Sequence, residues 1–236
     1  MNELPQGWCV FDEAESLAHQ AVELILNTAE QAIAERGAFH LVTAGGTTPN
    51  RCYELLREQK HQAWSKWFIY MGDERVLALD DPQRNSVSLY QAWLSSVPIP
   101  AENIQLIPTE LGLERAVALY NQTLAAVGTF DLVMLGMGED GHTASLFPAQ
   151  QNQLDSADVI GIRSAPKPPS ERVSLSYQRL ANTRVMLKLI SGVSKHEALQ
   201  AWLNKQSLPI NQLMAQQQTY VYIDQAAYSG VKSHLI

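Results

Sequence analysis

The sequence predicts an α/β fold in which a mostly parallel sheet carries helices on both faces. Two observations predict it. Segments with apolar residues at helical spacing alternate along the chain with short apolar segments, and those short segments are apolar without interruption. Strands buried on both faces read as continuous apolar runs, whereas strands with one wet face alternate. The 236 residues suit a single core, so we expect residues 1–236 to form one domain.

The first elements follow from spacing and from glycine and proline. A helix is expected at residues 13–35, where apolar residues recur every three or four positions. Gly37 then suits a helix end in the left-handed conformation. The apolar run 38–44 predicts a strand that breaks at Gly45-Gly46. A second helix should follow, because Pro49 is favoured in a first helical turn, where its missing N–H has no partner to lose.

The same alternation continues along the rest of the chain. Segment 73–85 is expected to be a polar loop, and Leu89, Trp93 and Leu94 can share one face of the helix after it. Strands are expected at 67–71, 130–138, 158–163, 172–177, 184–190 and 219–223, and helices at 86–96, 113–127, 195–205 and 209–217.

Composition narrows the classes of partner. A net charge of −7 and a pI near 5.3 give no overall attraction to nucleic acid or acidic membranes, so we expect neither as a partner. An anionic ligand would need local cations. Cys9 and Cys52 lack disulfide-framework or zinc-ligand spacing, and the N-terminus lacks an export signal, so a cytoplasmic protein is expected. The sequence does not specify an oligomeric state.

The first polar loop is a candidate phosphate site. Ligands of parallel sheets bind at the carboxyl ends of strands. There, Gly45 and Gly46 would let the backbone approach a ligand, and the helix starting at Thr47 and Thr48 offers free N–H groups to an anion. The alternative is a plain strand-to-helix turn in which a threonine caps the helix.

The second loop, Gly72 to Arg75, also follows a strand. Asp73 and Glu74 can accept hydrogen bonds from a sugar hydroxyl or orient a histidine, and Arg75 can hold a phosphate with two N–H groups. The alternative is a surface ion pair, which spacing alone favours.

The third loop, residues 135–148, is the richest in functional residue types. Gly138 and Gly141 bend the backbone around Asp140 and His142. Histidine is the side chain best suited to move protons near neutral pH. His142 can be such a base or a structural histidine, and Asp140 can orient it or simply cap the turn.

Further cations lie downstream, at Lys167, Arg172 and Lys195. Each alone is as consistent with a solvated surface residue. The chain lacks GxSxG, HExxH and a cysteine beside a histidine, so catalysis by an activated water, without metal, is the chemistry we expect.

Five segments, in this order and at these separations, together resemble the 6-phosphogluconolactonase family: AGGTTP (44–49), GDERV (72–76), FDLVMLGMGEDGHTASLFP (130–148), PKPPSERVSLS (166–176) and GVSKHEAL (192–199). The resemblance implies a modified Rossmann-like sheet, shared with glucosamine-6-phosphate deaminases and ribose-5-phosphate isomerases. It also implies hydrolysis of 6-phospho-D-glucono-1,5-lactone, the second step of the oxidative pentose phosphate pathway, with no cofactor and no metal.

The resemblance also implies site roles. His142 matches the general base, with Gly138, Asp140 and Gly141 supporting it, and Asp73 would position substrate or water. The remaining matches hold the phosphate: Gly45, Gly46, Thr47, Thr48, Arg75, Arg172 and Lys195.

The chain departs from the family pattern in a few places. Arg84-Asn85 stands where Ser-Asn is common, Thr47 replaces a serine, and Met71 stands where an aromatic residue is frequent. Arg84 could contact phosphate or face solvent.

Two other functions share parts of this pattern. A glucosamine-6-phosphate deaminase would carry an acidic residue after the histidine, where this chain has Ser145 to Pro148. A non-catalytic sugar-phosphate sensor would need a DNA-binding segment, and the first 35 residues hold only one long helix.

Overall fold

A computed structural model describes residues 4–60, 62–148 and 157–229 of the chain. Its centre is a seven-stranded sheet in the order β1-β10-β9-β6-β2-β3-β5, and every neighbouring pair is parallel. The strands are β1 Trp8–Phe11, β2 Phe39–Thr43, β3 Trp67–Met71, β5 Ile104–Gln105, β6 Phe130–Gly136, β9 Thr183–Ile190 and β10 Gln218–Asp224. The predicted α/β class is confirmed.

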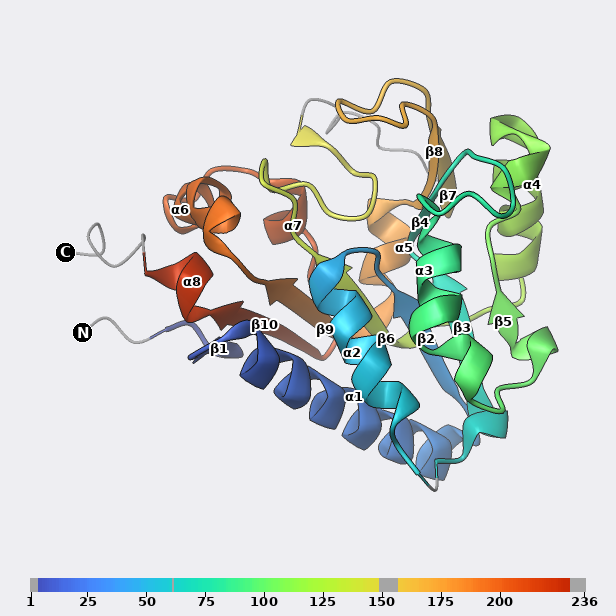
Figure 1. Cartoon of the computed structure of the whole chain (residues 1–236), viewed down its shortest axis with the longest axis horizontal. Coiled ribbons are helices and arrows are strands. Elements are labelled where there is room, and N and C mark those ends of the chain that lie inside the picture. The colour runs from blue at the N-terminus through green and yellow to red at the C-terminus, as the bar shows by residue number, and fades with distance from the viewer. Residues whose placement is uncertain (1–3, 61, 149–156, 230–236) are drawn as a thin grey trace.

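Helices connect these strands (Figure 1). The α-helices are α1 Ala14–Arg36, α2 Thr47–Arg57, α3 Asn85–Ala92, α4 Leu113–Leu124, α5 Tyr177–Ala181, α6 His196–Leu203, α7 Pro209–Gln212 and α8 Gln225–Tyr228. Short 3-10 helices lie at η1 Trp64–Lys66, η2 Leu94–Ser96, η3 Ala101–Asn103, η4 Thr109–Leu111 and η6 Val193–Lys195. Among the described residues, no helix is long and apolar enough to cross a membrane.

The predicted first helix is confirmed with its end. Helix α1 stops at Gly37, which has φ 82° and donates its N–H to the Ile33 carbonyl. A residue with a side chain rarely adopts this left-handed conformation, which explains why the apolar periodicity stops there. Leu89, Trp93 and Leu94 are all buried, but the helix expected at 86–96 is shorter than predicted. Only Leu89 belongs to α3, because Trp93 stands at its C-cap and Leu94 begins the 3-10 helix η2.

Helices cover both faces of the large sheet. Leu187 and Lys188 are consecutive residues of β9, so their side chains point to opposite faces. Leu187 pairs with Met134 of β6, whose sulfur is contacted by Tyr53 of α2. Lys188 instead packs under the ring of Trp202 in α6. Helices α2 and α6 therefore lie on opposite faces.

A second, three-stranded sheet differs from the prediction. Strands β4 (Asp73–Arg75), β8 (Arg172–Leu175) and β7 (Val159–Ile162) pair antiparallel in the order β4-β8-β7. The prediction of a polar loop at 73–85 is thus wrong for residues 73–75, which form β4. Strand β4 carries three charged residues, so it has no apolar signal; backbone pairing with β8 makes it a strand. The short strands β1 and β5 were also not predicted.

The carboxyl ends of the parallel strands meet at one edge of the large sheet, at the top of Figure 1. Strand β2 leads there into α2, β3 into β4, β6 into the glycine-rich loop, and β9 into η6. The predicted functional loops therefore lie at one edge, although they are far apart in the sequence.

Candidate active site

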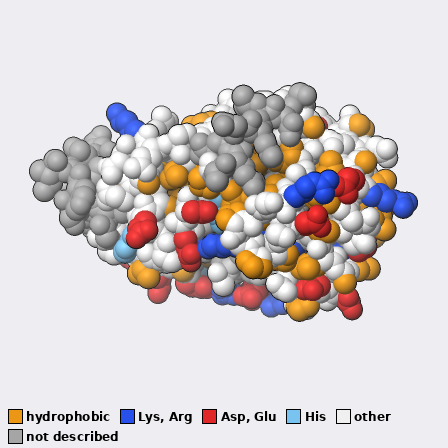
Figure 2. Space-filling view, turned by 90° about the horizontal axis from the view of Figure 1, so that it is seen from above, with side chains coloured by type: hydrophobic (Ala, Val, Ile, Leu, Met, Phe, Trp, Pro, Cys, Tyr) orange, Lys and Arg blue, Asp and Glu red, His pale blue; other side chains and the backbone are white. Residues whose placement is uncertain are grey.

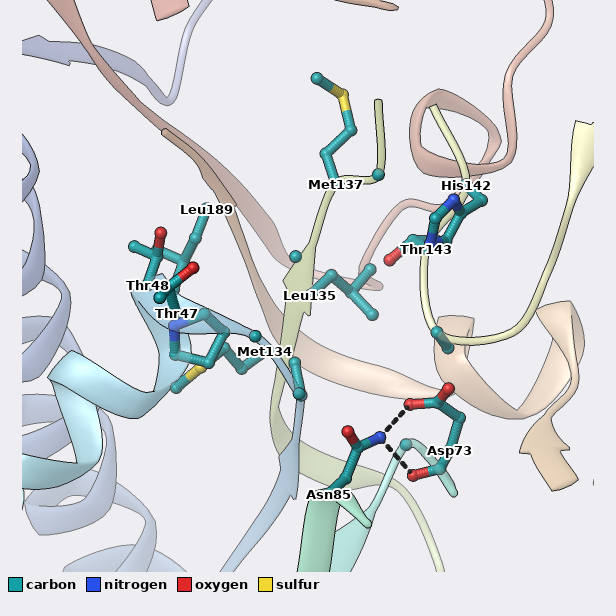
Figure 3. A pocket seen from close by; sticks show the side chains of 18 of the residues that line it. Thr47, Thr48, Asp73, Asn85, Met134, Leu135, Met137, His142, Thr143 and Leu189 are labelled. Carbon is teal, nitrogen blue, oxygen red and sulfur yellow. Dashed lines mark hydrogen bonds between the residues drawn. The ribbon is translucent and has the colours of Figure 1, made fainter. Parts of the chain in front are cut away.

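A cavity of about 270 Å³ opens at this edge of the sheet. Ten of the residues predicted for the site line it: Gly45, Gly46, Thr47, Thr48, Asp73, Arg75, Gly138, His142, Arg172 and Lys195. Figure 3 shows Thr47 and Thr48 on one side of the cavity, His142 on the other, and Asp73 below. Two predicted supporting residues, Asp140 and Gly141, do not line it.

The loop before α2 is shaped by its two glycines. Gly46 has φ 118° and stands at the N-cap of the helix, where a side chain would be strained. A Cβ at Gly45 would lie 2.2 Å from Oδ1 of Asn85, so only glycine fits. Thr47 and Thr48 are the first residues of α2, whose opening N–H groups have no partner within the helix. The loop thus offers donors to an anion.

His142 is held on its Nδ1 side. Nδ1 contacts Oδ1 of Asp140, and the same oxygen accepts the backbone N–H of His142 at 3.1 Å. Asp140 therefore both caps the turn and contacts the ring. A Cβ at Gly138 would lie 2.0 Å from Nδ1, and the Phe147 ring lies 4.8 Å from the imidazole, centroid to centroid. The imidazole has little room on these sides, and 19% of it is exposed.

The charge of Asp140 follows from this contact. Partial burial by itself would raise the pKa of the Asp140 carboxyl, but the hydrogen bonds and charge of His142 outweigh it and lower the pKa to about 2. Asp140 is therefore an anion at neutral pH.

The loop after β3 is not a surface ion pair. Asp73 is 6% exposed and Glu74 is fully buried, so the alternative that spacing favoured is wrong. Its failure has a physical reason: β4 turns into the second sheet, which carries the two carboxylates inward.

The cavity brings four cations together, and three of them, Arg75, Arg172 and Lys195, were predicted to hold phosphate. Arg172 is buried, and its guanidinium donates to the Pro169 and Lys167 carbonyls at 3.1 Å. Burial lowers the pKa of Arg172, with Asp73 opposing and Arg75 adding to the effect. Burial likewise lowers the pKa of Lys195, against the attraction of Glu139. Partial desolvation of these cations strengthens their attraction for an anion.

Lys167 and Glu139 both line the cavity and form an exposed ion pair, 2.8 Å between Nζ and Oε2. Such a pair contributes little stability.

Arg84 fits neither role considered for it. Its side chain is 1% exposed and donates to Glu110 Oε2 at 2.9 Å and to the Ile107 carbonyl at 3.1 Å, with Glu74 3.5 Å from Nε. It neither faces solvent nor lines the cavity. Arg84 instead lies between the carboxylates of Glu74 and Glu110 and offsets their charge.

Three residues of the site were not proposed from the sequence. Asn85 and Thr143 line the cavity, and Ser145 contacts Asp73 from the loop of His142. The available signal was weak: a polar residue just before an apolar helix, such as Asn85, normally suggests only a helix cap.

The face above the cavity is of mixed charge. Seen from above, acidic, basic and hydrophobic side chains lie interspersed, without a field of one sign (Figure 2). An anion would therefore be attracted by the local cations and not by the whole face. Among the described residues, no group of three or more His, Cys, Asp or Glu side chains is placed to hold a metal ion.

Comparisons with known proteins agree with one another. A family model described as glucosamine-6-phosphate isomerases/6-phosphogluconolactonase matches residues 12–222. A 6-phosphogluconolactonase from Nostoc sp. is 36% identical over 200 residues, which cover 80% of this chain and 82% of the relative.

Solved structures are similar over most of the chain. The crystal structure of 6-phosphogluconolactonase from Thermotoga maritima has a TM-score of 0.85 at 29% identity, covering 92% of this chain and 98% of that one. A monomeric glucosamine-6-phosphate deaminase has a TM-score of 0.82 at 20% identity, covering 95% and 100%, which shows a shared fold alone.

Proposed function

Because the chain belongs to the glucosamine-6-phosphate isomerase/6-phosphogluconolactonase family, we propose that His142 is the base that activates water in its reaction. The reaction is hydrolysis of 6-phosphogluconolactone to 6-phosphogluconate in the pentose phosphate pathway. The observation that carries the proposal is the contact between Nδ1 of His142 and the anionic Asp140. His142 lines the cavity across from Thr47 and Thr48 (Figure 3).

The contact with Asp140 favours one tautomer of neutral His142. A carboxylate accepts, so the hydrogen sits on Nδ1 and leaves Nε2 with a lone pair. Among the described residues, none hydrogen-bonds Nε2. Nε2 takes a proton from water as the water oxygen bonds to the lactone carbonyl carbon. The tetrahedral intermediate then expels the ring oxygen, which receives that proton as the ring opens.

The chemistry needs no covalent intermediate. A lactone is an activated ester, and a positioned base contributes about 10²–10⁴-fold to the rate. We propose that Asp73 accepts a hydrogen bond from a substrate hydroxyl or from the water, and so orients them.

We propose that the phosphate is held by the N–H groups at Thr47 and Thr48 together with Arg75, Arg172 and Lys195, which all line the cavity. Because the phosphate is remote from the reacting carbon, its binding energy serves to orient the ring.

The testing experiment follows the loss of freshly made 6-phosphogluconolactone above its spontaneous rate. His142→Asn should lower kcat by about 10²-fold or more while binding of 6-phosphogluconate survives. His19→Asn is the control, since that imidazole is 61% exposed on α1. Parental activity in His142→Asn would show that the base is wrong. Ammonia release from glucosamine 6-phosphate, measured in parallel, tests the deaminase alternative.

We also propose a cytoplasmic location, a single domain over residues 1–236, and no nucleic-acid or membrane partner. Support comes from the unpaired thiols of Cys9 and Cys52, the family match over residues 12–222, and the net charge of −7.

A further inference from the structure

We propose that Asn85 and Ser145 are positioning residues that hold the Asp73 carboxylate from both sides and thereby set its place between the phosphate loop and the loop of His142. The inference rests on the proposed function, because it gives Asp73 a role in orienting the lactone or water. It adds two residues, from α3 and from the loop after β6, to the machinery of the reaction.

Both oxygens of Asp73 already have a donor. Nδ2 of Asn85 lies 3.0 Å from Oδ1 and 3.1 Å from the backbone carbonyl of Asp73 (Figure 3). The Ser145 hydroxyl donates to Oδ2 at 2.6 Å. A carboxylate oxygen can accept two hydrogen bonds, so each retains one free position while the group itself cannot rotate. Asp73 thus presents fixed acceptors to a ligand.

The two donors cannot easily turn away. Asn85 is 7% exposed and Ser145 is fully buried, so neither can exchange Asp73 for bulk water. A buried donor that loses its acceptor costs about 1–3 kcal/mol, which favours the arrangement seen.

Asn85 is itself fixed by a buried carboxylate. Oε1 of Glu74 accepts the Asn85 N–H at 2.7 Å, and Oε2 accepts the Ser86 N–H at 2.8 Å. These are opening amides of α3, where a negative charge is favourable. Arg84 lies beside Glu74 and offsets the cost of burying its charge. The buried pair of Glu74 and Arg84 thereby fixes the start of α3, and with it the Asn85 side chain that contacts Asp73.

The Asn85 side chain also touches the phosphate loop. A Cβ added to Gly45 would lie only 2.2 Å from Oδ1 of Asn85. The backbone of the loop therefore packs directly against the Asn85 amide. Ser145, three residues after His142, connects Asp73 to the other wall of the cavity. One carboxylate therefore connects the segment that would hold phosphate with the segment that would hold the base.

This arrangement predicts a particular kinetic pattern. Asp73 would act on the sugar end of the substrate, so loosening it should lower kcat more than it raises KM. A misplacement of about 1 Å can cost up to about 10²-fold in rate. We expect Ser145→Ala and Asn85→Ala each to lower kcat by about 10-fold or more, with KM within about 3-fold of the parent.

The matched control variants each remove a buried side-chain group that donates a hydrogen bond outside the cavity. Thr183→Val deletes a fully buried hydroxyl that donates to the Val185 carbonyl at the other end of the sheet. Asn103→Ala deletes a buried amide that donates to the Ser65 carbonyl. Both should keep the parental kcat, even though they lower stability.

The deciding measurement is a double-mutant cycle for kcat on 6-phosphogluconolactone. If Ser145 acts through Asp73, Ser145→Ala should change kcat by less than about 2-fold in an Asp73→Ala background. Equal losses in both backgrounds, or parental kcat in both Ser145→Ala and Asn85→Ala, would overturn the inference. Parental kcat in Asp73→Ala would contradict both the role of Asp73 and this inference. The role of His142 is tested separately by His142→Asn, so the proposed function can hold even if this inference fails.

Discussion

Arg75 and Arg172 stand directly opposite each other on the antiparallel strands β4 and β8. Like charges in this position repel and destabilise the pair of strands. Asp73 attracts Arg172, but one carboxylate cannot neutralise both guanidiniums. A bound anion would therefore offset the remaining repulsion between the guanidiniums of Arg75 and Arg172.

Inorganic phosphate should accordingly stabilise the protein. At about 100 times its Kd, a ligand that binds only the folded state adds about 2.7 kcal/mol to the free energy of unfolding. The rise in Tm should shrink strongly in Arg172→Ala and stay parental in Arg163→Ala, whose side chain is 67% exposed. Thermal denaturation with and without phosphate measures both. The same rise in Tm in all three proteins would contradict the assignment of Arg172.

Lys195→Ala should act on substrate affinity. We expect KM for 6-phosphogluconolactone to rise by about 10-fold or more, because one charge-assisted contact is lost. KM for gluconolactone, which has no phosphate, should change little. Lys66→Ala is the control, since it is exposed and belongs to η1, before β3. Equal effects of Lys195→Ala on the two lactones would refute a phosphate contact.

The depressed pKa of Lys195 gives this contact a pH dependence. Burial makes the ammonium lose its proton at a lower pH than an ordinary lysine. Binding of 6-phosphogluconate should thus weaken as pH rises, beginning at a lower pH than an ordinary lysine would cause, and less so in Lys195→Ala. Titration calorimetry at several pH values would reveal it, and identical slopes in parent and variant would contradict it.

Asp140→Asn tests the orientation of the base. An amide can donate to Nδ1, which would move the imidazole hydrogen to Nε2 and block proton uptake there. We expect kcat to fall by about 10–10³-fold with KM nearly unchanged. Asp81→Asn is a matched control, because Asp81 also accepts a backbone N–H two residues ahead, from Gln83 at 2.8 Å. Comparable losses in both variants would mean that only the turn matters.

Lys188 should make stability depend on pH. Burial lowers its pKa to about 7, while Nζ donates to the Leu213 carbonyl at 2.6 Å. Between about 7 and the ordinary lysine value, the unfolded chain binds a proton that the folded protein does not, so the free energy of unfolding rises with pH. Below about 7 both states are protonated and this rise is absent.

Lys188→Met should remove that rise. Relative to the variant, the parent should gain up to about 1.4 kcal/mol per pH unit within this window. Urea denaturation of both proteins at pH 7, 8 and 9 measures the difference, and other titrating groups cancel in the comparison. A difference that stays constant with pH would show that Lys188 does not change protonation on folding.

Local signals explain what could be predicted from the sequence. Gly37 ends a helix through its own φ, and Pro49 marks a first helical turn, so both act within a few residues of the feature they predict. The loop of His142 was recognisable for the same reason, since its glycines and polar residues are adjacent.

Contacts between distant segments could not be predicted in this way. The Ser145–Asp73 hydrogen bond joins residues 72 positions apart, and Arg84 is buried only because Glu74 and Glu110 meet it in space. Strand β4 likewise exists through pairing with β8, nearly a hundred residues later in the chain. The sequence thus predicts the residue types of the site more readily than the contacts that orient them.

The position of β1 has a consequence for how the protein is made. This first strand lies at the edge of the large sheet, and its one sheet neighbour among the described residues is β10, which ends at Asp224. On the ribosome, β1 emerges before β10 and lacks this strand partner until β10 has been synthesised. A nascent or truncated chain lacking β10 would carry β1 without its strand partner and leave β9 with an open edge, which favours association with other chains. Strand β1 can therefore dock in the sheet only long after its own synthesis.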